Sequence, residues 1–375
     1  MGNAANDLSK PWPEKFELLD GFRGIAASGV LLHHLNVADI GHYCVMVFFV
    51  ISGYCITSSA MSGVRQGTTT QRFIYNRIRR IYPPYLLAVA FFAATRLARF
   101  LVTGEPWTAS LTTWIQNLTL TQWLTLTVHP MLEAPQNPTL FVAAFWSLNY
   151  EIQFYLVMAV GLGLARRGRA GFIQLIAALT LIGIALNLGW PGLAVRGVFI
   201  EYWAHFGLGA AMYFLLCGRG RQWTLEDRRW ISLLIALLLI FFIWRLRDMP
   251  GAHFAQLRHV LERYAISGAA VLSLLILRPY DAIVARHWLW RPVSAVGTIS
   301  YSLYLVHQFN LTAVAKVAAE LLPPSISVTA NLILQIGLHL LIAASFWACC
   351  ERPFQRTSKN SKGHHIPNAK PLAPQ

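Results

Sequence analysis

The sequence consists of long apolar blocks separated by short polar connections. Most blocks run for roughly 18 to 25 residues, the length at which an α-helix crosses the hydrocarbon core of a bilayer. Apolar residues make up 55% of the chain and charged residues only 13%, whereas about a quarter of a soluble domain is charged. The alternating pattern of a membrane β-barrel is absent. The sequence therefore predicts an all-α integral membrane protein.

The blocks predict a bundle of about ten transmembrane helices. Residues 1–15 are expected to form an N-terminal segment and residues 16–356 the membrane domain. The polar residues 357–375 are expected to form a disordered tail. No secretory signal peptide is evident. The expected spans are at about 20–37, 42–61, 78–101, 139–164, 172–189, 195–216, 229–246, 260–278, 295–320 and 327–350.

Lys and Arg concentrate in alternate connections between the spans, and this asymmetry predicts that both termini are cytoplasmic. Basic residues gather at 10–15, 65–80, 166–169, 219–229, 278–291 and 352–370. The seventh connection, which holds Arg245, Arg247 and Arg258, is the exception. The topology signal accounts for most of the net charge of +15. It argues against nucleic-acid binding, since no soluble domain is left to present a basic face.

No metal is expected to bind. The five cysteines lie in or beside apolar blocks, and their spacing fits neither a zinc site nor a disulfide framework.

Ionisable residues inside the first span form a stripe. Arg23 and His34 are eleven positions apart, so on a helix they share a face to within about 20° and are separated by roughly 16 Å. His33 points about 80° away from that face. Asp20, three residues before Arg23, is placed to pair with it. The stripe predicts a lined cavity, or alternatively a buried polar pair that stabilises helix packing.

Three further groups of ionisable residues are candidates for the same site as the stripe of the first span. Glu151 is the only charged residue between Glu133 and Arg166, and a carboxylate at that depth needs a partner or water. His307 is expected at a depth similar to that of His34. Arg77 and Arg80, three residues apart at the entry of the third span, form a candidate anion site. Alternatively, these two arginines only set the orientation of the chain in the membrane and contact lipid phosphates.

Five stretches resemble, in the right order, the signatures of the membrane acyltransferase 3 family, a bacterial family of multi-pass enzymes. The resemblance covers about residues 16 to 356. The residues that match directly are Arg23, His34, Arg77, Arg80, Trp146, Ser147, Leu148, Glu151, Gln153, Phe154 and Tyr155. The last two signatures match through "ISYSLYLVHQ", which holds Ser300, Tyr301 and His307, and "ERPF", which begins at Glu351.

The resemblance implies an O-acyltransferase of the bacterial inner membrane, expected as a stand-alone member without an esterase-like domain. It implies transfer of an acyl group, usually acetyl from cytoplasmic acetyl-CoA, to a hydroxyl of a cell-surface or secreted carbohydrate or glycolipid. O-antigen, exopolysaccharide and lipo-oligosaccharide are the acceptor types. The alternatives are an enzyme that acts on a macrolide-type small molecule and a polytopic transporter or flippase of glycans. Transporters often show paired repeats with broken helices, and none is evident in the sequence.

On this reading Arg23, Arg77 and Arg80 bind the phosphates of acyl-CoA, and His34 meets the thioester. His34 acts either as a general base or as a nucleophile that carries the acyl group. Glu151 or His307 orients its imidazole. Asp20, Trp146, Ser300, Tyr301 and Glu351 are expected to support the site.

Overall fold

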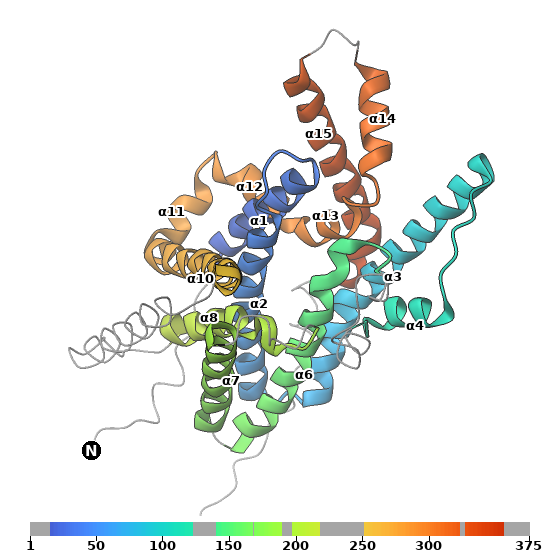
Figure 1. Cartoon of the computed structure of the whole chain (residues 1–375). Coiled ribbons are helices and arrows are strands. Elements are labelled where there is room, and N and C mark those ends of the chain that lie inside the picture. The colour runs from blue at the N-terminus through green and yellow to red at the C-terminus, as the bar shows by residue number, and fades with distance from the viewer. Residues whose placement is uncertain are drawn as a thin grey trace, which may run out of the picture.

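The computed structural model describes residues 16–122, 140–167, 169–189, 197–217, 251–322 and 327–355. In these ranges every regular element is a helix (Figure 1), which confirms the all-α class. The α-helices are α1 (Leu18–His34), α2 (Gly41–Arg65), α3 (Thr70–Thr103), α4 (Leu111–Thr119), α6 (Trp146–Arg167), α7 (Arg169–Gly189), α8 (Ile200–Cys217), α10 (Gly251–Leu277), α11 (Asp281–Arg286), α12 (Trp290–Thr298), α13 (Ser300–Val306), α14 (Leu311–Leu321) and α15 (Val328–Phe346). The 3-10 helices are η3 (Ala143–Phe145), η4 (Arg278–Tyr280) and η6 (Arg352–Phe354), and η5 (Trp347–Glu351) is a π-helix.

Within the described ranges, 6 helical segments are long and apolar enough to cross a membrane. They correspond to six of the expected spans and make the chain a multi-pass membrane protein. The first and sixth expected spans coincide with α1 and α8, which have 17 and 18 residues. The seventh expected span and both termini lie outside the described residues, so the count of ten and the cytoplasmic termini stay predictions. The six segments are Gly41–Arg65, Thr70–Thr103, Ala143–Ala165, Gly171–Gly189, Leu257–Arg286 and Val328–Phe354.

The prediction of one continuous helix at 295–320 is wrong, because the structure divides this stretch among α12, α13 and α14. At the second break, His307 Nδ1 bonds to the carbonyl oxygens of Leu303 and Tyr304. Asn310 donates to the carbonyl oxygen of Val306. Side chains that bond locally to the backbone compete with helix propagation. Irregular backbone at membrane depth is tolerated where protein surrounds it, and both His307 and Asn310 are buried.

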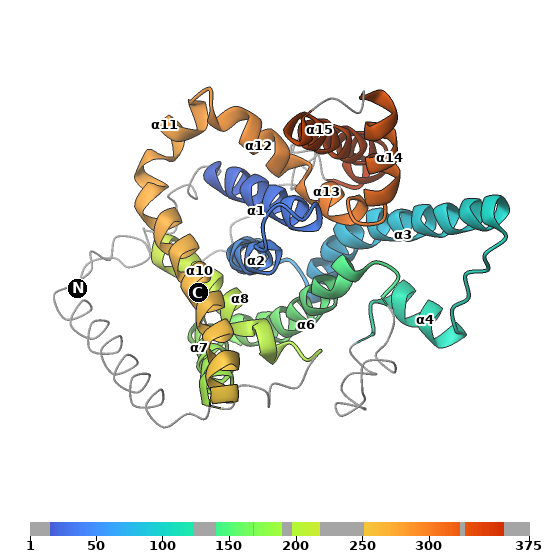
Figure 2. The ribbon, with the colours of Figure 1, turned by 45° about the horizontal axis from the view of Figure 1, so that its top comes forward.

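Helix α2 lies at the centre of the bundle and packs against α1, α6, α8 and α10. Figure 2 looks nearly along α2 and shows these helices around it. Buried apolar residues around α2 join the main core, among them Val45, Met46, Phe49, Ile51 and Ile56. The centre of the core is therefore a helix that packs against α1 and α6, two of the elements that carry the predicted site.

Helices α1 and α12 approach each other backbone to backbone at a pair of glycines. A Cβ atom on Gly24 would lie 2.0 Å from the carbonyl oxygen of Val293. A Cβ atom on Gly297 would lie 1.6 Å from the carbonyl oxygen of Asp20. Small residues at helix contacts allow this approach in membranes, where van der Waals packing drives association. The contact fixes the beginning of α1, which carries Arg23, against the beginning of the interrupted stretch α12–α14.

Helices α1 and α2 define two ends of the bundle. The arginine end comprises the beginning of α1, the end of α2 and the beginning of α3, which carry Arg23, Cys55 and Arg77. The histidine end comprises the end of α1 and the beginning of α2, which carry His34 and His42. The two ends are linked by the eleven residues of continuous helix from Arg23 to His34, which correspond to roughly 16 Å.

Candidate active site

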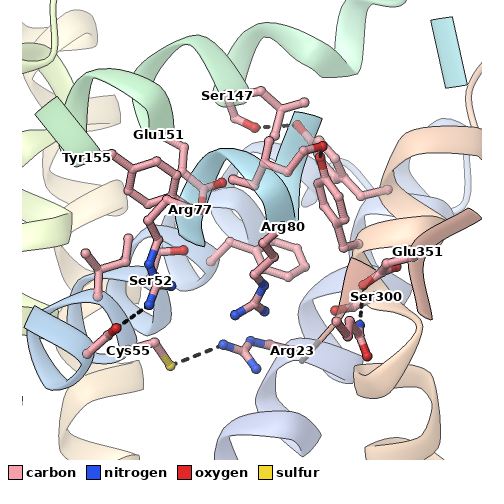
Figure 3. Close-up of a pocket in the computed structure, with 18 of the residues that line it drawn as sticks. Arg23, Ser52, Cys55, Arg77, Arg80, Ser147, Glu151, Tyr155, Ser300 and Glu351 are labelled. Atoms are coloured by element: carbon pink, nitrogen blue, oxygen red, sulfur yellow. Dashed lines mark hydrogen bonds between the residues drawn. The ribbon is translucent and has the colours of Figure 1, made fainter. Parts of the chain in front are cut away.

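A pocket of about 650 Å³ lies between α1, α2, α3, α6 and the stretch from α12 to α13 (Figure 3). Residues 351–355, which follow α15, close its remaining side. The sequence did not predict its shape, but most of the predicted site residues line it. Eight of them do so, from five separate regions of the sequence: Asp20, Arg23, Arg77, Arg80, Glu151, Ser300, Tyr301 and Glu351. The fold thus brings the candidate donor-binding residues and Glu151 around one cavity.

Three guanidinium groups gather in the pocket, as Figure 3 shows for Arg23, Arg77 and Arg80. Arg23 Nη1 donates to Asp20 Oδ1 at 3.0 Å, which confirms the predicted pair, and its Nη2 contacts Cys55 Sγ at 3.2 Å. Arg77 Nη2 donates to Ser59 Oγ. Arg77 Nε is buried and has no hydrogen-bond partner among the described residues.

This cluster has the chemistry of an anion site. Guanidinium groups are planar, permanently charged and suited to binding phosphate through two parallel hydrogen bonds. Arg80 is exposed and Arg23 and Arg77 are half-buried, so the charges extend from the surface into the pocket. Arg79, which also lines the pocket, adds a fourth positive charge.

Glu151 projects from α6 into the same pocket. Tyr155, one helical turn further along, donates its hydroxyl to Glu151 Oε1 at 2.6 Å. Figure 3 shows both side chains beside Arg77. The carboxylate therefore has a neutral hydrogen-bond donor on its own helix and a guanidinium group nearby, which is how a charge at this depth is stabilised.

Glu351 lies in the π-helix η5 and is 4% exposed. Its carboxylate accepts hydrogen bonds from Ser302 Oγ at 2.5 Å and Gln355 Nε2 at 2.8 Å. Tyr301, which lines the pocket beside it, donates its hydroxyl to the carbonyl oxygen of Ile81 at 3.0 Å. These bonds join α13 to α3 and to the end of α15. Glu351 and Tyr301 thus hold the pocket wall together, and π-helical turns are frequent at functional sites.

His34 and His307 form a pair at the histidine end. Their ring centroids are 5.0 Å apart, and His307 is 1% exposed whereas His34 is half-buried. His307 Nδ1 lies 3.0 Å from the carbonyl oxygens of both Leu303 and Tyr304. Carbonyl oxygens only accept, so Nδ1 carries the proton and Nε2 of the neutral ring holds a lone pair. This Nε2 is buried and has no partner among the described residues.

His33 and His34 have different surroundings, in agreement with the predicted angle between them. His33 Nδ1 lies 3.2 Å from Asp39 Oδ1, and its ring centroid is 4.9 Å from that of His34. His34 instead faces His307. Of the two residues expected to orient the His34 imidazole, His307 is the one that the structure places against it.

Neither His34 nor His307 is among the described residues that line the pocket. Tyr304 connects the two regions, because it lines the pocket and its ring centroid is 6.0 Å from that of His307. Its hydroxyl lies 2.7 Å from Ser147 Oγ and also bonds to the carbonyl oxygen of Ala144. Trp146 lies elsewhere, at the beginning of α6, where its ring stacks on His42.

The sequence reasoning missed Tyr304 and the two partners of the arginines, Cys55 and Ser59. A signal for two of them was present. Ser52, Cys55 and Ser59 are spaced three and four residues apart on α2, the spacing of one helical face, and all three line the pocket. Among the described residues no group of three or more His, Cys, Asp or Glu side chains is placed to hold a metal ion.

Comparison with known proteins identifies the family of the chain. The family model described as an acyltransferase domain, that of the acyltransferase 3 family, matches residues 16–350. The chain is 26% identical over 332 residues to the exopolysaccharide production protein ExoZ of Rhizobium meliloti, which covers 87% of this chain and 92% of ExoZ. It is 28% identical over 299 residues to BcsY of Komagataeibacter xylinus, covering 77% of this chain and 71% of BcsY.

A third relative is the O-acetyltransferase OatA of Staphylococcus aureus. It is 24% identical over 324 residues, and the match covers 77% of this chain and 49% of OatA. No solved structure matches the chain significantly. Because the family model covers nearly all of the chain and the relatives include an O-acetyltransferase, the chain belongs to the acyltransferase 3 family and is an O-acyltransferase.

Proposed function

We propose that this protein transfers an acetyl group from cytoplasmic acetyl-CoA to a hydroxyl of a cell-surface or secreted carbohydrate or glycolipid. The observation that carries the proposal is the arrangement of charges along α1. Three guanidinium groups gather in a pocket at its beginning, and an imidazole pair lies at its end. Coenzyme A has the matching form, with phosphates at one end of a long flexible arm and the thioester at the other.

In this proposal the arginine end faces the cytoplasm of a bacterial inner membrane, an orientation that the concentration of Lys and Arg in alternate connections supports. Arg77 and Arg80 bind the phosphates, and Arg23, held by Asp20, adds a third contact. Glu151 and Tyr155 position Arg77 from the opposite wall. The arm extends from the arginines toward Ser147 and Tyr304, where the pocket adjoins the histidine pair.

The histidine pair supplies the chemistry of transfer. During the proposed reaction, the N–H of His34 donates a hydrogen bond to Nε2 of His307, which has no other partner among the described residues, and the second ring nitrogen of His34 acts as the base. That base takes the proton of the acceptor hydroxyl while the oxygen attacks the thioester carbonyl, and the CoA thiolate leaves. In the alternative route, His34 itself attacks the thioester and passes the acetyl group to the acceptor. In both routes His307 stabilises the charged form of His34.

The acceptor class is supported by the relatives, because one is named for exopolysaccharide production and another as an O-acetyltransferase. The donor is tested first, with purified protein in detergent. Acetyl-CoA is expected to raise the melting temperature, as any ligand of the native state does. Dephospho-CoA should have a smaller effect because it lacks one phosphate.

The reaction is tested by transfer of labelled acetyl from acetyl-CoA to de-O-acetylated polysaccharide from the strain that carries the gene. Wild-type protein is expected to label it, and a folded His34→Ala variant is not. An unchanged melting temperature at saturating acetyl-CoA, together with no labelling, would overturn the proposal.

A further inference from the structure

Three aromatic rings from three helices form a platform at the histidine end. The platform consists of His42 of α2, Trp146 of α6 and Tyr202 of α8. The His42 and Trp146 rings are stacked, with centroids 5.6 Å apart and planes 13° apart. The Tyr202 ring lies 6.1 Å from His42 and 5.2 Å from Trp146.

The platform has an open side. Tyr202 is buried, Trp146 is half-buried and His42 is exposed. Packing alone would favour full burial of such rings, since their contribution to stability comes mainly from the area removed from water. An exposed ring that packs on two others instead offers a flat surface on which a ligand can stack.

Charged and hydroxyl groups of α10 and α2 flank the platform. The guanidinium group of Arg263 lies over the Tyr202 ring, 5.6 Å from its centroid. Glu262 accepts from Tyr43 at 2.5 Å and pairs with Arg258 at 2.8 Å. Arg258 belongs to the seventh expected connection, which holds basic residues although the alternating pattern predicts few there. The rule that basic residues mark cytoplasmic connections therefore does not explain its presence. These groups offer hydrogen bonds beside an aromatic surface.

The platform adjoins the histidine pair through Gly41 and His33. A Cβ atom on Gly41 would lie 2.6 Å from Cδ2 of His33, so the first turn of α2 is packed directly on that ring. The His33 and His34 ring centroids are 4.9 Å apart. The platform is therefore linked to His34, the catalytic base of the proposed reaction, through the contacts of Gly41 with His33 and of His33 with His34.

We propose that the platform is the acceptor subsite and that its ligand is a sugar ring of a carbohydrate chain. The C–H face of a pyranose packs on the exposed ring of His42, and its hydroxyl groups bond to the polar side chains of α10. Such a combination of apolar surface and a few polar groups is typical of small-molecule sites. The inference rests on the proposed function, because it assigns the acceptor of the same reaction.

The test compares His42→Ala with His42→Phe, which keeps a ring. The control is His287→Ala, which removes another exposed histidine stacked on a tryptophan, Trp288, with ring centroids 6.1 Å apart. The readout is the KM for neutral and acidic fragments of de-O-acetylated polysaccharide from the strain that carries the gene. His42→Ala is expected to raise the KM about tenfold, the effect of losing one aromatic contact. Its kcat and its melting-temperature shift with acetyl-CoA should stay unchanged.

His42→Phe is expected to stay within threefold of the wild-type KM, and His287→Ala within twofold. A KM in His42→Ala that equals that of the control would overturn the subsite, as would equal losses in His42→Ala and His42→Phe. Binding of the same fragments is also measured without donor, by saturation-transfer NMR. If the wild type does not transfer acetyl, the proposed function fails, whereas ring-dependent binding in the NMR measurement still supports the platform. Absence of binding by the wild type overturns it.

Discussion

Replacing Arg77 with Gln tests the donor site most directly. The substitution removes a positive charge from the pocket and keeps a polar side chain of similar length. Arg77 has spare hydrogen-bonding capacity, because Nη2 donates to Ser59 while Nε is buried without a partner among the described residues. Arg23 has less, since it already contacts both Asp20 and Cys55. We therefore expect Arg77 to contribute most to phosphate binding.

The magnitude follows from the hydrogen bonds that are lost. A hydrogen bond to a charged group contributes roughly 1.5–3 kcal/mol, so one lost phosphate contact should weaken acetyl-CoA binding about 10- to 150-fold. Titration calorimetry of the detergent-solubilised protein measures this. The matched control is Arg72→Gln, on the same helix but exposed and not among the residues that line the pocket. It should change the Kd less than twofold.

Two results would refute the reasoning. Equal affinities for Arg77→Gln and Arg72→Gln would show that the cluster only serves topology or contacts lipid phosphates. A large drop in the melting temperature of ligand-free Arg77→Gln would show that the residue mainly maintains the fold through Ser59. The melting temperature without ligand is therefore recorded for both variants before titration.

Three further outcomes are expected. His34→Ala should lower the rate of acetyl transfer roughly 10²- to 10⁴-fold with acetyl-CoA binding unchanged, and a loss below tenfold in a transfer assay would contradict its role as base or nucleophile. His307→Phe, which keeps the ring but removes the Nε2 acceptor, should lower kcat about tenfold or more with the donor KM unchanged; steady-state kinetics that match the wild type would remove His307 from the mechanism. Gly297→Ala should destabilise the fold by about 1–3 kcal/mol through overpacking, because the new Cβ would lie 1.6 Å from a carbonyl oxygen of α1. The control is Gly163→Ala, where the Cβ meets nothing within 4 Å, and equal melting temperatures for the two variants would show that the contact at Gly297 is not tight.

Local periodicity predicted the parts of the fold and site that depend on one helix. The angle between successive helical residues separated His34 from His33, and the structure gives the two rings different partners. The spacing of Asp20 and Arg23 predicted their ion pair. These predictions succeed because a helix fixes the direction of each side chain relative to its neighbours.

The breaks in the helix between residues 295 and 320 could not be predicted from periodicity or hydropathy. Hydropathy is averaged over a window, and the apolar residues of this stretch outweigh its few polar ones, such as His307 and Asn310. The break depends on side-chain bonds from His307 and Asn310 to backbone carbonyl oxygens, and on neighbouring helices that bury them. The connection through Tyr304 between pocket and histidine pair depends likewise on how α13 packs against α6. Such long-range contacts leave no period in a single sequence.

The distribution of the pocket along the chain has a consequence for biosynthesis. Its lining begins at Asp20 in α1 and ends at Gln355, beyond the π-helix. At about 5–20 residues per second, the ribosome needs roughly 20 to 70 seconds to make the chain between these two positions. For most of that time the arginines of α1 and α3 have been made and the wall that Glu351 completes has not. A nascent chain that stalls before Glu351 is therefore expected to be inserted in the membrane but to bind its donor weakly, because one wall of the pocket is missing.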